Sequence, residues 1–475
     1  MSNISNKRVY ASSICVALIL SGCVSFTESR IPSSEAGVPN VPEKFLNEEL
    51  GDHDGAVPST TEWWGIYNDP TLESLIRRLE AANPDLEAAL ARRDRSFAVL
   101  GITRTSLLPA IDGELSAGRR RDSLNNLLFP ISTSEYDHYR IGVGASWELD
   151  LWGRVRATVM RDRLSAQASE FNFQDLRLSL QANLARQYFA TRTAQVELEI
   201  LEDTLRIRDE NLKIQESRLL LGTGVEVDVA RARVEFHNAR AAKESAIRNL
   251  GKMRHSMAVL IGIAPIDFDK EFPLHEKASF RVPRISVGLP SSLLERRADL
   301  RAADRALQSA AAQLGIRHAD FLPKITLNGT GGRASLSADN IFNPDSALFD
   351  IGPRVSFPIF RGRIRKFALA QAQANWREAS ANYKSAFLTA ILEVEDALLN
   401  LQSLTRESSA IKEAAKAANL AAVAARKRHD SGLASYFEFI DAERDRLRVR
   451  LAENILLGEQ QATSVSLVQA LGGSW

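Results

Sequence analysis

Cysteine is almost absent from the sequence: the chain of 475 residues has only two, Cys15 and Cys23. We expect Cys15 to be removed with an export signal that ends at residue 22. A single remaining cysteine cannot form an internal disulfide or a cysteine-based metal centre. The composition therefore excludes a disulfide-stapled fold and thiol redox chemistry within the mature chain.

Long apolar runs and an excess of charge are missing too. After residue 24 no stretch reaches the about eighteen consecutive apolar residues that a transmembrane helix needs. We therefore do not expect a helical membrane protein. The formal net charge is only +1, from 60 basic and 59 acidic residues. Because nucleic-acid binding proteins carry a basic surplus, no nucleic-acid partner is expected.

Motifs that carry catalysis or cofactor binding are also absent. The sequence has no G-x-S-x-G, Walker A, H-E-x-x-H or C-x-x-C pattern. Its seven histidines are scattered, and none is followed by another histidine four residues later. That spacing would place two metal ligands on one helix face. The sequence therefore predicts no enzyme activity, no cofactor and no metal site.

The N-terminus has the pattern of an export signal. A basic start and a short apolar stretch, residues 9–20, precede Leu20-Ser21-Gly22-Cys23. This quartet resembles a bacterial lipobox, in which the cysteine sulfur is acylated before cleavage. We therefore predict a signal peptide over residues 1–22 and a lipid on Cys23. An ordinary secretory signal is the alternative. The residue after the cysteine is Val24 and not Asp. By resemblance to lipoprotein sorting rules, the absence of Asp at this position favours export to the outer membrane.

The chain contains an internal duplication with a period of about 210 residues. Leu100-Gly101-Ile102 recurs as Leu314-Gly315-Ile316, and Gly153-Arg154-Val155-Arg156 recurs as Gly362-Arg363-Ile364-Arg365. The matches occur in the same order in both halves, so we infer a duplicated unit. The predicted segments are an N-terminal anchor and equatorial segment at 23–70, a first repeat at 71–262, an equatorial linker at 263–290 and a second repeat at 291–475.

Each repeat contains two stretches in which apolar residues alternate with polar or small ones, the pattern of a β-strand. The four candidate strands lie at 111–117, 141–149, 324–328 and 351–357, and loops 121–136 and 336–348 join them in pairs. Four strands cannot close a membrane-spanning sheet, and open edges in lipid leave backbone groups unsatisfied. Several chains must therefore contribute to one barrel.

Two very long helices are predicted as well. Residues near 155–221 and 364–430 contain no internal Gly or Pro, and each would span about 100 Å at about 1.5 Å per residue. Within 198–221, Leu and Ile recur every seven residues in two stripes on nearly opposite flanks. Such a helix needs a neighbour on each side, like a stave in a ring. The central helix of a bundle is the alternative, but Arg206 and Arg208 favour solvated faces.

Three stretches carry a family resemblance. They are Trp63-Trp64-Gly65, residues 149–156 (LDLWGRVR) and residues 289–300 (LPSSLLERRADL). Over nearly the whole mature chain the sequence resembles the TolC-like outer-membrane factors, specifically the NodT-type lipoprotein branch of drug-efflux exit ducts. Ala298 departs from the family, which usually has proline there, but alanine also suits a helix start.

This resemblance implies an α+β membrane protein that works as a trimer. Four strands per chain would make a twelve-stranded β-barrel in the outer membrane, continuous with a long periplasmic α-helical barrel. The implied function is a passive exit duct for small molecules such as drugs, held by its lipid in the outer membrane and extending into the periplasm. The implied partners are a periplasmic adaptor and an inner-membrane RND-type pump.

The resemblance also assigns roles to four residues. Residues 436–444 (YFEFIDAER) look like the family's tip motif, in which an apolar residue and an Asp four positions later face the lumen. Phe437 and Asp441 would then form the pore constriction. The alternative is that Phe437 packs between helices and Asp441 is a solvated charge. Pro109 and Pro323 would mark helix–strand junctions, although a plain turn role explains them equally well.

Two other functions stay open on the sequence alone. A lipid-anchored periplasmic coiled-coil scaffold accounts for the helices and the lipobox, but it leaves the strands without a role. A type I protein-secretion duct has the same architecture. In such systems the pump usually decides which substrate is exported.

Overall fold

The computed structural model describes residues 62–121, 135–273, 290–357 and 362–473, with the isolated positions 42, 44–46, 282–283, 285 and 359–360. The predicted signal peptide 1–22, the lipid site Cys23 and most of the loop 121–136 lie outside the described residues. The chain divides into two compact units. The first comprises Met1–Val38, Arg92–Glu170 and Ala302–Lys384, and the second comprises Pro39–Ala91, Phe171–Arg301 and Ser385–Trp475. Each unit draws on both halves of the sequence, and the predicted repeat boundaries stay predictions.

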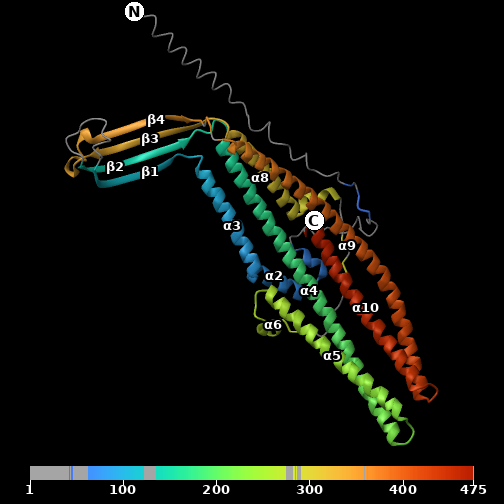
Figure 1. The fold of residues 1–475 in the computed structure, drawn as a ribbon. Coiled ribbons are helices and arrows are strands. Elements are labelled where there is room, and N and C mark those ends of the chain that lie inside the picture. Colours follow the sequence, from blue (N-terminus) through green and yellow to red (C-terminus); the bar gives the residue numbers. More distant parts are fainter. Residues whose placement is uncertain are drawn as a thin grey trace, which may run out of the picture. The chain divides into compact units, whose positions relative to one another are not determined.

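The first unit contains one antiparallel sheet in the order β1-β2-β3-β4 (Figure 1). Its strands are β1 (Ala110–Arg121), β2 (Glu135–Glu148), β3 (Lys324–Ser335) and β4 (Ala347–Ser356). The prediction of four strands is confirmed, but all four are longer than predicted. In β3 the apolar alternation ends before the strand does. Gly332 lets the strand stay paired with β2, because a Cβ atom at this position would lie only 2.3 Å from the Ile141 carbonyl oxygen.

The register of the sheet collects its large apolar side chains on one face. Residues directly opposite in an antiparallel pair share a face, and Leu115 lies opposite Ile141 as Trp147 lies opposite Leu327. This apolar face consists of Ile111, Leu115, Ile141, Val143, Trp147, Leu327, Phe349, Ile351 and Val355, all exposed in the single chain. The opposite face carries Glu114, Asn328 and Asp350. One side of the sheet therefore suits an apolar surrounding and the other suits water.

Two long helices, α4 (Arg154–Leu220) and α9 (Ile364–Asp430), have 67 residues each. The predicted helices near 155–221 and 364–430 are confirmed almost to the residue. Among the described residues no helix is both long and apolar enough to cross a membrane.

The junction between β2 and α4 explains residues 149–156. The Asp150 carboxylate accepts hydrogen bonds from the backbone N–H groups of Val155 and Arg156, both at 2.9 Å. These N–H groups have no partner within the helix, and a carboxylate there also complements the helix dipole. The Arg154 guanidinium donates two hydrogen bonds, of 2.9 and 2.6 Å, to the Glu148 carboxylate. The motif therefore ties the end of a strand to the start of a helix.

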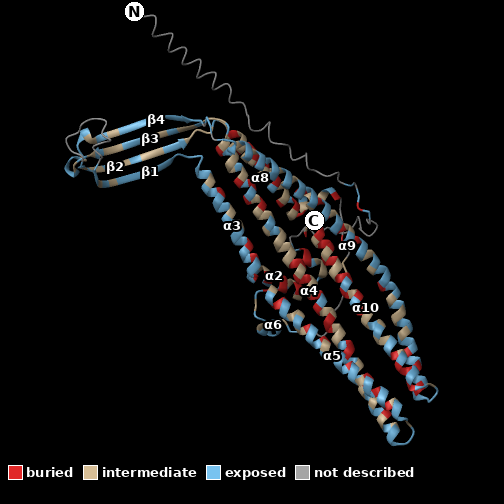
Figure 2. Ribbon diagram, in the orientation of Figure 1, coloured by how far each residue is buried: buried red, intermediate tan, exposed pale blue. Residues whose placement is uncertain are grey.

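The second unit contains the main hydrophobic core. Four helices are shared with the first unit: α4, α9, α3 (Pro84–Thr105) and α8 (Ala298–Ala319). The other elements of the second unit are η4 (Trp63–Tyr67), α2 (Pro70–Ala82), α5 (Glu226–Leu260), α6 (Pro265–Glu271), η6 (Pro290–Ser292), α7 (Leu293–Arg296) and α10 (Tyr436–Ala470). Trp63 and Leu72 pack with Leu184 of α4, Phe387 of α9 and Val465 of α10 in one buried cluster. Figure 2 shows buried residues gathered on these helices, whereas the sheet is exposed or intermediate.

We predict that Asp150→Ala lowers the free energy of unfolding by about 1 kcal/mol, because two helix N–H groups lose their acceptor. Thermal melting of the purified protein, followed by circular dichroism, measures this. Asp150→Asn keeps an acceptor oxygen and should lose less. Identical melting of the alanine variant and the wild type would show that the cap does not stabilise the helix.

Candidate functional site

The candidate site lies in the second unit, where each long helix turns back. After α4 the chain turns at Gly222 and enters α5, and after α9 it turns at Gly432 and enters α10. Both glycines have a left-handed backbone, with φ of 72° and 74°. Other residues rarely adopt this conformation, and it closes helix C-termini. Both long helices therefore end in the same kind of glycine turn.

A buried aromatic cluster anchors the start of α10 behind these turns. Tyr436, Phe439 and Ile440 pack against Ala232 of α5. The ring of His429, at the end of α9, stacks on Phe439 with 5.6 Å between centroids and 13° between planes. Since Phe439 and Ile440 point into this cluster, their neighbours Phe437 and Asp441 point elsewhere on the helix.

Phe437 and Asp441 lie one helical turn apart, and both are exposed in the single chain, Phe437 to 56%. The guanidinium carbon of Arg231, on α5, lies 5.7 Å from the centre of the Phe437 ring. The structure therefore brings the two predicted constriction residues to one free face of α10. Their role in a pore stays a prediction.

A buried ionic cluster lies further along the same helices, and the sequence did not reveal it. Arg208 of α4 is only 3% exposed, so the expectation that it occupies a solvated face was wrong. Its Nε lies 3.7 Å from a carboxylate oxygen of the buried Glu235 of α5. Arg444 of α10 donates to Glu235 at 3.0 Å through its own Nε. One carboxylate thus connects three helices.

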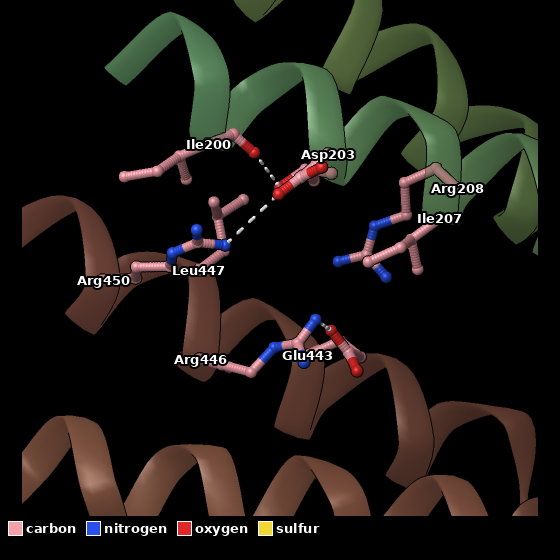
Figure 3. Close-up of a pocket in the computed structure, with 9 residues that line it drawn as sticks. Ile200, Asp203, Ile207, Arg208, Glu443, Arg446, Leu447 and Arg450 are labelled. Atoms are coloured by element: carbon pink, nitrogen blue, oxygen red, sulfur yellow. Dashed lines mark hydrogen bonds and ion pairs between the residues drawn. The ribbon is translucent and has the colours of Figure 1, made fainter. Parts of the chain in front are cut away.

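Arg208 also borders a small pocket between α4 and α10. Figure 3 shows Arg208 from α4 and Glu443 and Arg446 from α10 around this space. Arg446 holds the buried Glu443 at 2.6 Å, and the Nη1 atom of Arg208 is buried without a hydrogen-bond partner among the described residues. Burial lowers the pKa of Arg208, and Glu235 and Glu443 oppose that shift.

The other predicted residues have the following positions. Pro109 lies between α3 and β1, and Pro323 lies between α8 and β3. The Pro323 carbonyl accepts a 2.7 Å hydrogen bond from the Trp152 ring. Within the described part of the chain, no group of three or more His, Cys, Asp or Glu side chains is placed to hold a metal ion. What these prolines do beyond this placement stays a prediction.

Comparisons with known proteins agree on one family. The family model described as Outer membrane efflux protein matches residues 75–262 and 289–473. The solvent efflux pump outer membrane protein SrpC of Pseudomonas putida is 32% identical over 428 residues, which are 88% of each chain. The solved outer-membrane channel OprN has a TM-score of 0.84 at 26% identity, covering 92% of this chain and 98% of its own. The open state of the Neisseria gonorrhoeae MtrE outer membrane channel has a TM-score of 0.80 at 26% identity, covering 91% and 95%.

We predict an asymmetry between two substitutions in the ionic cluster. Glu235→Gln leaves the buried Arg208 without its carboxylate and should lower the local unfolding free energy by about 3 kcal/mol. Arg444→Gln removes a half-exposed partner and should cost less than about 1 kcal/mol. Hydrogen exchange of the amides in 200–212 and 230–240 measures both losses.

The matched control is Arg208→Met combined with Glu235→Gln. It removes the buried cation as well, and should recover most of the lost protection. Equal losses in the two single variants would contradict the view that burial of Arg208 makes Glu235 necessary.

Proposed function

The chain belongs to the outer membrane efflux protein family and is an outer-membrane efflux channel, and from this premise we propose how it works. It is the passive exit duct of a tripartite pump, acts as a homotrimer and catalyses no reaction. An inner-membrane RND-type pump supplies the energy, and a periplasmic adaptor connects the pump to the duct.

The sheet is the observation that carries this proposal. Its apolar face suits lipid, its polar face suits a water-filled lumen, and the edges of β1 and β4 have no neighbouring strand among the described residues. In lipid an unpaired edge costs several kcal/mol per backbone group. Three copies joined from β4 to β1 would supply twelve strands and leave no free edge. A periplasmic scaffold without a pore would leave the apolar face in water, which makes that alternative unfavourable.

The long helices support the same arrangement on the periplasmic side. At about 1.5 Å per residue, α4 and α9 each extend about 100 Å. On α4, Ile214 and Leu219 are exposed in the single chain. This is expected if helices of other copies cover them in the assembled tube. Small molecules are the proposed cargo, since the relative SrpC is named for solvent efflux. This favours efflux over protein secretion.

We further propose that Phe437 and Asp441 form the closed constriction. Both are exposed on one face of α10, behind which Phe439 and Ile440 hold the helix in place. Three phenyl rings and three carboxylates around one axis would narrow the lumen and favour cations. The related MtrE channel has a structure described as its open state, so a channel of this kind has more than one state.

We predict that Phe437→Ala increases single-channel conductance by about twofold or more in a planar bilayer, because an apolar constriction is removed. Asp441→Ala should reduce the preference for cations, measured as the reversal potential in a salt gradient. Asp209→Ala is the control, because Asp209 is a carboxylate on α4 that pairs with Lys213 at 2.6 Å. A large conductance that responds to neither change would keep the duct and place its gate elsewhere.

The lipid anchor is a separate proposal and rests on the sequence Leu20-Ser21-Gly22-Cys23. A lipid on Cys23 would hold each copy at the outer membrane independently of its strands.

We predict that Cys23→Ser abolishes lipid attachment and cleavage after residue 22, because serine lacks the nucleophilic sulfur. Mass spectrometry of the N-terminal peptide checks this. An acylated mature protein from the serine variant, or an unmodified Cys23 in the wild type, would contradict the anchor.

A further inference from the structure

His429 connects the two helix turns of the candidate site. This residue is 8% exposed and lies at the end of α9. The Nε2 atom lies 3.1 Å from Nη1 of Arg218, in the last turn of α4, and Nδ1 lies 3.3 Å from the carbonyl oxygen of Ala434. Arg218 itself supports the first turn, since its carbonyl accepts the backbone N–H groups of Thr223 and Gly224. One hydrogen bond therefore joins the α4–α5 turn to the α9–α10 turn.

The two partners determine the protonation of this imidazole. A guanidinium has only donors, so the Arg218 bond requires an Nε2 atom without a hydrogen. A carbonyl only accepts, so the proton lies on Nδ1 and points at Ala434. This geometry accommodates the neutral ring alone. A second proton on Nε2 would remove the acceptor and place two cations about 3 Å apart, which is strongly repulsive away from water.

Within the described part of the chain, His429 has Arg218 and Ala434 as its hydrogen-bond partners and forms no ion pair with a carboxylate. From α10, Tyr436 and Phe439 face the ring, and burial raises the pKa of Tyr436 to about 12, which keeps its phenol neutral. Glu438 of α10 is engaged by Arg428 of α9 at 3.2 Å. On α5, Asp228 pairs with Arg231 at 3.9 Å.

We propose that His429 is a pH-sensitive latch: the neutral imidazole holds the two turns together through Arg218, and its protonation releases them. This rests on the proposed function, because release matters only if the turns border a gate. Histidine is the side chain that ordinarily changes charge between about pH 5 and pH 8. Acidification of the periplasm would then favour the open state of the duct.

The test compares wild type with His429→Gln at about pH 7.5 and about pH 5.5. Glutamine offers Arg218 a neutral acceptor that does not titrate. In planar bilayers we expect the open probability of the wild type to rise about tenfold on acidification, and that of the glutamine variant to change little. Asp441 and the other carboxylates are present in both proteins, so the difference isolates the imidazole.

Hydrogen exchange provides a second readout that does not depend on conduction. Protection factors of the amides in 429–436 should fall at the lower pH in the wild type and stay constant in the glutamine variant. Arg218→Met removes the repelling cation, so it should abolish the pH response even if the glutamine variant folds poorly.

The outcomes separate the latch from the channel. An equal pH response of wild type and both variants, in conduction and in protection, would overturn the latch. Absence of conductance from all three inserted proteins would instead refute the proposed function, while the protection factors would still decide whether protonation loosens the turns.

Discussion

The backbone groups along the two outer strands of the sheet constrain the rest of the molecule. β1 and β4 each have one neighbour among the described strands, and the apolar face leaves water unsuitable as the surrounding medium. In lipid, only closure of the sheet pairs these groups. Closure requires further copies of the same chain, and copies arranged around one axis bring the long helices around that axis too. The oligomer is therefore a consequence of strand number rather than an added property.

Further along the helices from the turns a different constraint applies, because polar groups are buried where helices approach closely. Glu235 lies between Arg208 and Arg444, which come from different helices. An isolated buried charge is costly, so such a cluster favours one arrangement of α4, α5 and α10 over others. The exposed Phe437 is on the same helix as Arg444. A movement of α10 as a rigid helix would therefore either carry this cluster along or break it.

Much of the fold could be predicted because its signals are local. The limits of α9 follow from Gly362 and Gly432 on either side of a segment without Gly or Pro. Strand lengths were underestimated because glycines and arginines interrupt the apolar alternation, whereas ladder pairing depends on the neighbouring strand. The burial of Arg208 was missed for a related reason. A charged residue between two apolar stripes indicates a solvated face, unless another helix supplies its partner.

The candidate site shows the same limit more clearly. The spacing of Phe437 and Asp441 on one face is a property of a single helix, so the sequence reveals it. The pairs Arg208 with Glu235 and Arg218 with His429 depend on how helices come together, and His429 is 211 positions from its partner. No local pattern distinguishes these residues from the many other charged residues on long helices.

The two halves of the sequence have the same order of strands and long helices but differ in their contacts. The Asp150 side chain caps α4. The residue 209 positions later, before α9, is Ile359, whose side chain has no hydrogen-bond acceptor. Arg218 and Arg428 are likewise equivalent by sequence, yet Arg218 bonds to His429 in the other repeat whereas Arg428 pairs with Glu438 in its own. Bonds within one hairpin survive when that hairpin moves as a unit, but bonds between hairpins must break. The contacts between the hairpins, Arg218 with His429 and Arg444 with Glu235, are therefore the ones that set the cost of moving α9 and α10 away from α4 and α5.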